Sequence, residues 1–278
     1  MSRTMKIFKD PGKLRKWAAG RGRDGAKIGL VPTMGFLHDG HLSLIAEAKR
    51  RKADEIVVSI FVNPVQFRPG EDYESYPRDE KADLAKCRAA GATAVFLPSP
   101  EAMYLPRHST YVEETDLSTG LCGARRPGHF RGVCTVLAKL FNLVRPDFAV
   151  FGLKDFQQAR VVKRMVRDLD FGIEIVSAPI VREPSGLAMS SRNSYLSPVE
   201  RERAVAISRA LASIAPGCAA GAAKRKIRAA LEKAGLKVDY VECVDSETLE
   251  NAKRAEKSAC ILVAAYDGKT RLIDNRLM

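Results

Sequence analysis

The feature that most constrains the fold of this 278-residue chain is an alternation of short apolar runs with longer amphipathic segments. The short runs are rich in β-branched residues, as buried strands are, and lie at Ile28–Val31, Glu55–Val62, Thr93–Leu97, Asp147–Phe151 and Ile173–Val176. Patterns typical of helices lie between them, near residues 41–52, 78–89, 132–144 and 155–168. This alternation predicts an α/β fold, a Rossmann-like doubly wound parallel sheet with helices on both faces. In such sheets ligands bind at the carboxyl ends of the strands.

The pattern changes after residue 182. Ser197-Pro198-Val199-Glu200 is typical of a helix start, because serine caps the helix, proline suits its first position and glutamate closes a capping box. We expect helices at 198–214 and 221–234, then strands at 237–243, 260–266 and 270–273, with Asp267-Gly268 in a hairpin turn. The sequence therefore predicts two domains, residues 1–182 and a smaller C-terminal α+β domain at 183–278.

Charge and cysteine content restrict the class of protein. Lys and Arg number 46 against 33 Asp and Glu, a net charge of +13, which favours nucleic acid, a membrane surface or an anionic small molecule as a partner. The basic residues are dispersed and aromatic residues are only 7%, so nucleic acid is disfavoured. The six cysteines form no C-x-x-C pair, and none is spaced with a histidine as zinc ligands are, which predicts free thiols in a reducing cytoplasm. The sequence offers neither a signal peptide nor a membrane-spanning apolar run.

Two glycine motifs resemble nucleotide loops but lie in the wrong context. Residues 20–25 spell G-x-G-x-x-G, yet they follow a predicted helix and precede the first strand, the reverse of a dinucleotide-binding motif. Gly268-Lys269-Thr270 resembles the end of a phosphate loop, but Val263 stands where that motif requires glycine. We expect neither to bind a nucleotide.

The strongest functional signal is VPTMGFLHDGH at residues 31–41, which begins at the end of the first strand and runs into a helix. Gly35 and Gly40 allow the backbone to approach a ligand closely. His38 and His41 lie near a helix start, where free N–H groups and the helix dipole attract anions. We therefore expect a phosphate site here.

Four further groups contain polar residues suited to ligand binding. Asn63 and Gln66 follow the second strand and offer neutral donors and acceptors, although Asn-Pro is also a common turn. The segment 151–158 brings glycine, lysine, aspartate and Gln158 to another strand end. Residues 189–192 place two hydroxyls and a guanidinium in a segment expected to be irregular, which suits a triphosphate. The basic loop 125–132 is compatible with nucleic acid, a substrate carboxylate or simple solvation.

Taken together and in order, these strings resemble the pantothenate synthetase (pantoate–β-alanine ligase) family. The matching strings are VPTMGFLHDGH (31–41), FVNPVQF (61–67), EDYESYPRD (71–79), RPGHFRGV (126–133), VRPDFAVFGLKD (144–155) with Gln158, and VREPSGLAMSSRN (181–193). The second domain matches only loosely, through VDYVECVD at 238–245. The resemblance implies a cytoplasmic homodimer that uses ATP and Mg²⁺ to join (R)-pantoate to β-alanine through a pantoyl adenylate, with residues 1–182 catalytic and 183–278 a lid domain.

The resemblance also implies roles for individual residues. It assigns catalysis to His41, His38, Lys154 and Arg192, and substrate binding to Gln66, Gln158, Asn63 and Arg126. It assigns ATP binding to Met34, Gly35, Phe36, Leu37, His38, Asp39, Gly40, His41, Gly152, Leu153, Lys154, Asp155, Val181, Met189, Ser190, Ser191 and Arg192. The sequence shows no recognisable set of carboxylate ligands for a metal. Magnesium is therefore expected to bind mainly to the ATP phosphates, with Asp83 a weak candidate ligand.

This chain departs from the family pattern at Leu153, where glutamate is usual, and at Arg68, where glycine is usual. Two other readings remain open. The H-x-G-H string is also compatible with a nucleotidyltransferase that adenylates a phosphate-bearing substrate, and the +13 charge with a nucleic-acid-binding module.

Overall fold

The computed structural model describes residues 4–278, which divide into two compact units. The first comprises the chain up to Leu153 together with Gln158–Ala178, and the second comprises Lys154–Gln157 and Pro179–Met278. The short segment Lys154–Gln157 therefore groups with the C-terminal unit.

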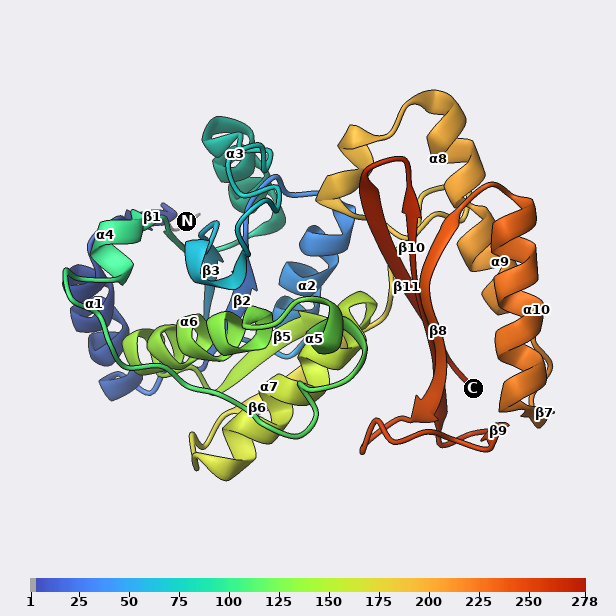
Figure 1. The fold of residues 1–278 in the computed structure, drawn as a ribbon. Helices are drawn as coiled ribbons and strands as arrows, with labels where there is room; N and C mark the ends of the chain where they lie inside the picture. Colours follow the sequence, from blue (N-terminus) through green and yellow to red (C-terminus); the bar gives the residue numbers. More distant parts are fainter. Residues whose placement is uncertain (1–3) are drawn as a thin grey trace. The chain divides into compact units, whose positions relative to one another are not determined.

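The first unit is built on a six-stranded sheet in which every pairing is parallel (Figure 1). The order is β1-β4-β3-β2-β5-β6, so the strand order reverses between β2 and β5. The strands are β1 (Lys6–Phe8), β2 (Ile28–Thr33), β3 (Glu55–Ile60), β4 (Ala94–Phe96), β5 (Phe148–Gly152) and β6 (Glu174–Ala178). The predicted Rossmann-like fold class is confirmed.

Helices flank this sheet because the strands are apolar on both faces. Val31, Val58 and Val150 pack with residues of α2 and α3, while the alternate strand residues, such as Leu30, are buried on the other side. The helices are α1 (Pro11–Arg23), α2 (Asp39–Arg50), α3 (Glu80–Ala90), α4 (Pro100–Met103), α5 (Leu121–Arg125), α6 (His129–Val144) and α7 (Phe156–Asp168). Gly20 and Gly22 lie inside α1, in agreement with the view that their motif is no cofactor loop.

The second unit combines a three-stranded antiparallel sheet, of order β11-β10-β8, with helices. Its elements are α8 (Pro198–Ala204), α9 (Ala206–Ala212), β7 (Cys218–Ala219), α10 (Ala220–Lys233), β8 (Lys237–Asp245), β9 (Arg254–Ala255), β10 (Ala259–Asp267) and β11 (Thr270–Leu277). The core joins apolar residues of α10, such as Ile227 and Leu231, to Val241 and Val263 of the sheet. The smaller α+β C-terminal architecture is thus as predicted.

The local signals in this unit behave as expected, with one exception. Ser197 and Glu200 form the predicted capping box, and β10 and β11 join through the two-residue turn at Gly268 and Lys269. The single helix expected at 198–214 is wrong, because the helical hydrogen bonding is interrupted at Val205 between α8 and α9.

Candidate active site

The loop that joins β2 to α2 carries the strongest sequence motif and is shaped by two positive backbone angles. Gly35 has φ +85° and Phe36 has φ +51°, so the chain turns sharply as it leaves the sheet. The Gly35 N–H donates to Thr33 Oγ1 at 3.1 Å, and the Thr33 hydroxyl donates to the Ser59 carbonyl at 2.8 Å. A Cβ at Gly35 would lie 2.9 Å from Ile60 Cγ2, so only glycine fits this position.

Two side chains of α3 hold this loop from the side. Asp83 is 2% exposed, and its carboxylate accepts hydrogen bonds from the Phe36 N–H at 2.8 Å and the Leu37 N–H at 2.7 Å. Lys86, one turn along the helix, donates from Nζ to the Leu37 carbonyl at 2.5 Å. Burial raises the pKa of Asp83, although the two backbone N–H groups oppose the shift. From the sequence, Asp83 was expected only as a weak candidate for a metal ligand, and Lys86 had no predicted role.

The two histidines of the motif stand together at the start of α2. His38 is the N-cap residue, and its ring centroid lies 4.1 Å from that of His41. The His38 backbone N–H donates to His41 Nδ1 at 3.4 Å, so a neutral His41 ring carries its proton on Nε2. The start of α2 thus places an imidazole N–H donor at the positive end of the helix dipole, which favours an anion there.

Asn63 and Gln66 come from the 3-10 turn η1 (Pro64–Gln66), which follows β3. They are buried, at 1% and 8% exposure, and the Asn63 Nδ2 donates to Gln66 Oε1 at 3.2 Å. The Gln66 Nε2 lies 2.9 Å from the sulfur of Met34, which belongs to the β2–α2 loop. The structure therefore brings the first two sequence motifs together within the first unit.

The backbone of Gln66 is held by a chain of charged and polar groups. Glu71 accepts from Arg126 Nε at 2.9 Å and from Nη2 at 2.6 Å, and Arg126 Nη1 lies 3.1 Å from His129 Nε2. His129 Nδ1 lies 2.9 Å from the Gln66 carbonyl, so a neutral ring protonated on Nδ1 satisfies both contacts. Burial alone would raise the pKa of Glu71, but Arg126 more than offsets it and the pKa is lowered. Arg126 thus faces Glu71 and His129, and its charge is already paired.

Glycine permits a close approach of α6 to this turn. A Cβ at Gly132 would lie 2.6 Å from Gln66 Cα and 2.6 Å from the Val65 carbonyl oxygen. No larger residue fits without moving the turn that carries Gln66.

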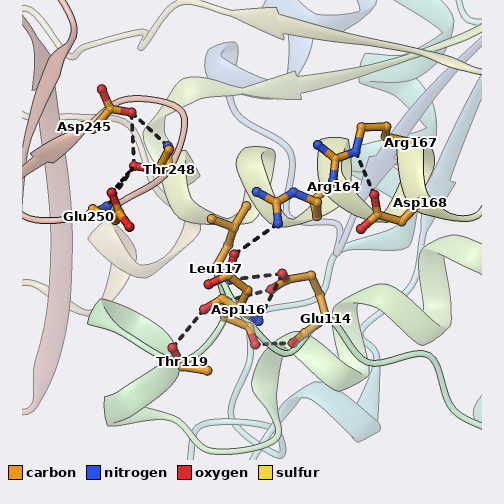
Figure 2. Close-up of polar contacts among 11 residues, drawn as sticks. Glu114, Asp116, Leu117, Thr119, Arg164, Arg167, Asp168, Asp245, Thr248 and Glu250 are labelled. Carbon is orange, nitrogen blue, oxygen red and sulfur yellow. Dashed lines mark hydrogen bonds and ion pairs between the residues drawn. The ribbon is translucent and has the colours of Figure 1, made fainter.

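The segment that leads to Arg126 is fastened by a buried carboxylate (Figure 2). Glu114 accepts from the backbone N–H groups of Asp116, Leu117 and Ser118 at 3.1, 3.0 and 2.8 Å. Arg164 of α7 donates to Asp116 at 3.1 Å and ties the segment to the helix layer. These contacts fix the chain just before α5, which ends at Arg125.

In the second unit, Lys154 lies beside a strand of the C-terminal sheet. Its carbonyl accepts from Asn275 Nδ2 of β11 at 3.1 Å, and its Nζ lies 3.7 Å from Asp155 Oδ2. Gly152 ends β5 in the first unit, so the predicted segment 152–155 crosses the boundary between the two units. Gln158 lies in the first turn of α7.

Residues 189–192 were expected to lie in an irregular segment, and the stretch 181–195 around them contains no helix or strand before the 3-10 turn η3 (Ser191–Tyr195). It is nevertheless tightly bonded. The Met189 N–H donates to the Val181 carbonyl at 3.0 Å, and Ser190 Oγ accepts from the Arg192 N–H at 3.3 Å. Two residues predicted to bind ATP, Val181 and Met189, are therefore joined by a backbone hydrogen bond.

Ion pairs fasten this segment to the rest of the second unit. Glu183 accepts from Arg201 at 3.0 Å and from Asn193 at 2.8 Å, and Asp274 of β11 accepts from both Nη1 and Nη2 of Arg182. In the same unit Asp245 accepts from the Thr248 N–H and closes the turn after β8 (Figure 2).

Comparison with known proteins identifies the family. The model of the family described as pantoate-beta-alanine ligase matches residues 6–277. A pantothenate synthetase of Myxococcus xanthus is 54% identical over 97% of this chain and 94% of its own length. A crystal structure of pantothenate synthetase from Thermus thermophilus has a TM-score of 0.91 at 44% identity, over 98% of this chain and 99% of that one.

This chain belongs to the pantoate–β-alanine ligase family. The family and the enzyme class predicted from the sequence are confirmed. A further solved member, the pantoate-beta-alanine ligase of Francisella tularensis, matches with a TM-score of 0.84 at 33% identity, over 99% of this chain and 98% of that one. Its title describes a complex with beta-gamma ATP and beta-alanine.

The structure places Arg68 and Leu153, the two residues that depart from the family pattern, in different loops of the chain. Arg68 donates from Nη1 to the Arg125 carbonyl at 2.7 Å, so its added charge is directed at the loop before α6. Leu153 stands in the 3-10 turn η2 (Leu153–Asp155), directly after β5.

A metal cage is not evident in this ligase. Within residues 4–278 no group of three or more His, Cys, Asp or Glu side chains is placed to hold a metal ion. Asp83, the weak candidate, directs both carboxylate oxygens at backbone N–H groups, so it does not fit a magnesium ligand. In the same part of the chain no helix is long and apolar enough to span a membrane.

Proposed function

We propose that this chain joins (R)-pantoate to β-alanine with ATP, giving pantothenate, AMP and pyrophosphate. The observation that carries the proposal is the match to the pantoate–β-alanine ligase family along nearly the whole chain, from residue 6 to 277. The H-x-G-H motif at the carboxyl end of β2, beside the point where the strand order reverses, supports a nucleotide site at that edge.

In the first step a pantoate carboxylate oxygen attacks the α-phosphorus of ATP, and the bond to the β-phosphate oxygen breaks. Negative charge grows on the phosphate oxygens and on the departing pyrophosphate. Preorganised donors aimed at such charge contribute about 3–4 kcal/mol each when they are well placed. We assign this role to His38, His41, Lys154, Ser190, Ser191 and Arg192. No covalent enzyme intermediate is required.

In this proposal the nucleotide is held by the residues that the resemblance assigns to ATP. They are the loop Met34–His41, the segment 152–155, Val181 and Met189–Arg192. We assign pantoate to Gln66 and Gln158. Asn63 and Arg126 lie beside Gln66, but their side chains already bond to other protein groups. We therefore propose that these two residues position Gln66 rather than bind the substrate.

In the second step the β-alanine amine attacks the acyl carbon of pantoyl adenylate. The bond between that carbon and the phosphate oxygen breaks, and AMP leaves. Magnesium enters in this proposal as part of the substrate, MgATP, because Mg²⁺ in nucleotide sites is bound largely by the substrate's phosphates. We further propose a cytoplasmic homodimer, with residues 183–278 acting as a lid on a catalytic domain at 1–182.

The test is AMP formation by the purified chain with each substrate omitted in turn. The proposal expects AMP only when ATP, pantoate and β-alanine are all present, together with pantoate-dependent exchange of pyrophosphate into ATP. AMP formation without pantoate, or exchange that instead depends on a phosphate-bearing acid, would identify a different nucleotidyltransferase.

A further inference from the structure

Tyr104 lies outside every sequence motif, yet it contacts the first-unit site. It follows α4, its ring centroid lies 6.3 Å from that of Phe61, and its hydroxyl donates to Asn63 Oδ1 at 2.8 Å. Burial raises the pKa of Tyr104, although the hydrogen bond to Asn63 opposes the shift. The hydroxyl therefore remains protonated, and a donor, throughout the neutral range.

The orientation of the Asn63 amide is set by backbone groups whose polarity is fixed. The Val65 N–H can only donate, and it points at Oδ1 at 3.3 Å. The Gly132 carbonyl can only accept, and it lies 3.1 Å from Nδ2. Asn63 is also 1% exposed, so its polar atoms serve the protein rather than a ligand. Of its two oxygen contacts, the one from Tyr104 is the shorter by half an ångström.

This orientation is passed on to Gln66. Because Asn63 Nδ2 donates to Gln66 Oε1 at 3.2 Å, the oxygen of Gln66 faces Asn63 and its Nε2 faces the opposite way. There Nε2 meets the thioether sulfur of Met34 at 2.9 Å, and a thioether is a weak acceptor. An oxygen atom of a bound hydroxy acid would accept a stronger hydrogen bond from this Nε2 than the sulfur does.

We propose that Tyr104 is a positioning residue for the hydroxy acid substrate, and that it acts through Asn63 to make Gln66 present an N–H donor to a substrate oxygen. This inference rests on the proposed function for the identity of the substrate. It names a specificity as well, because a carboxylate or hydroxyl oxygen fits opposite Gln66 and an ammonium group does not.

The test compares Tyr104→Phe with Tyr111→Phe. The His108 ring lies 5.0 Å from the Tyr104 ring and 5.1 Å from the Tyr111 ring. Tyr111 is therefore a matched control, because the hydrogen bond to Asn63 Oδ1 comes from Tyr104. Loss of one neutral hydrogen bond corresponds to about a 3- to 10-fold change in an equilibrium constant. We expect Tyr104→Phe to raise the KM for pantoate by about that factor with less than a twofold change in the KM for ATP, and Tyr111→Phe to leave both unchanged.

A second arm asks whether the effect passes through Gln66. In a Gln66→Ala background the proposal expects Tyr104→Phe to have no further effect on the KM for pantoate. An equal effect in both backgrounds, an equal rise in the KM for ATP, or an unchanged pantoate KM in a folded Tyr104→Phe variant would overturn the proposal.

A third arm is independent of catalysis. Solvent exchange of the Asn63 and Gln66 side-chain amide protons, followed by NMR, should become about 3- to 10-fold faster in Tyr104→Phe, the same factor as for one lost hydrogen bond, and stay unchanged in Tyr111→Phe. Identical exchange in both variants would overturn the relay. Absence of pantoate-dependent activity in the unmodified chain would instead contradict the proposed function, so the two failures are distinguishable.

Discussion

Two predicted ligand-binding segments, one in each unit, are fastened in different ways. The β2–α2 loop is held by Asp83, a carboxylate at 2% exposure. In the 181–195 segment, the pair of Arg182 with Asp274 is joined by a second pair, Glu183 with Arg201, whose side chains are 16% and 42% exposed. A buried donor that loses its partner costs about 1–3 kcal/mol. A partly exposed ion pair is worth roughly 0.2–1 kcal/mol. The first segment should therefore be more sensitive to loss of Asp83 than the second is to loss of Glu183.

The largest expected effect concerns the chemistry carried by the first segment. We predict that His41→Ala lowers kcat by about 10²–10³, the scale for one lost transition-state donor. Thermal stability should change little, because the ring stands at a helix start rather than in the core. The matched variant is His108→Ala, which removes a histidine outside the motif. Normal turnover by His41→Ala would remove His41 from the mechanism.

Asp83→Ala tests the buried fastening itself. Two backbone N–H groups, of Phe36 and Leu37, lose their acceptor, so the free energy of unfolding should fall by about 2 kcal/mol. The KM for ATP should rise with it, since the loop carries both histidines. Asp83→Asn keeps one acceptor oxygen, so its free energy of unfolding should lie between those of the unmodified chain and Asp83→Ala. Glu80→Gln, an exposed change on the same helix, is the control. Equal stability of Asp83→Ala and Glu80→Gln in denaturant unfolding would refute the assigned role.

A smaller effect, dependent on pH, is expected at Glu71. Because its pKa is lowered in the folded protein, Glu71 stabilises the fold above the ordinary glutamate pKa of about 4.3, and this contribution is lost as the pH falls through the folded pKa. The mainly buried pair with Arg126 makes the contribution about 1 kcal/mol. Glu71→Gln should therefore be less stable than the unmodified chain at pH 7, and the difference should shrink toward pH 3. A constant difference across that range would contradict the cause.

The smallest effect is predicted for Glu183→Gln in the second unit. The free energy of unfolding should change by less than about 1 kcal/mol, because the Arg201 side chain is partly exposed to solvent. The KM for ATP should change by less than about fivefold, which corresponds to the same energy. A loss of stability as large as that of Asp83→Ala would break the comparison between the two segments.

Much of this arrangement follows from local sequence pattern. The five apolar runs became β2 to β6, and the placement of motifs at strand ends followed from their order along the chain. The local pattern could not predict the features that depend on contacts between residues far apart in the sequence. β1 is only three residues long and exists through its pairing with β4, and the Tyr104–Asn63 bond joins residues 41 apart. The interruption between α8 and α9 at Val205 lies in a stretch without Gly or Pro, so the local sequence did not predict it.

The same limit applies to the candidate site. The motifs named His38, His41, Gln66 and Asn63, because these residues stand beside strand ends. They gave Asp83 no role in holding the β2–α2 loop, since it reaches Phe36 and Leu37 from 47 and 46 residues away. Which side chains fasten a loop is decided by helix packing against the sheet, and a single sequence carries no pattern for that.

A crystal structure of the chain with a non-hydrolysable ATP analogue and magnesium is the most direct test of the proposed nucleotide site. We predict that His38 and His41 contact the phosphates, together with Lys154, Ser190 and Arg192, and that Mg²⁺ lies on phosphate oxygens. A nucleotide bound elsewhere, with both imidazole rings facing solvent, would contradict this assignment.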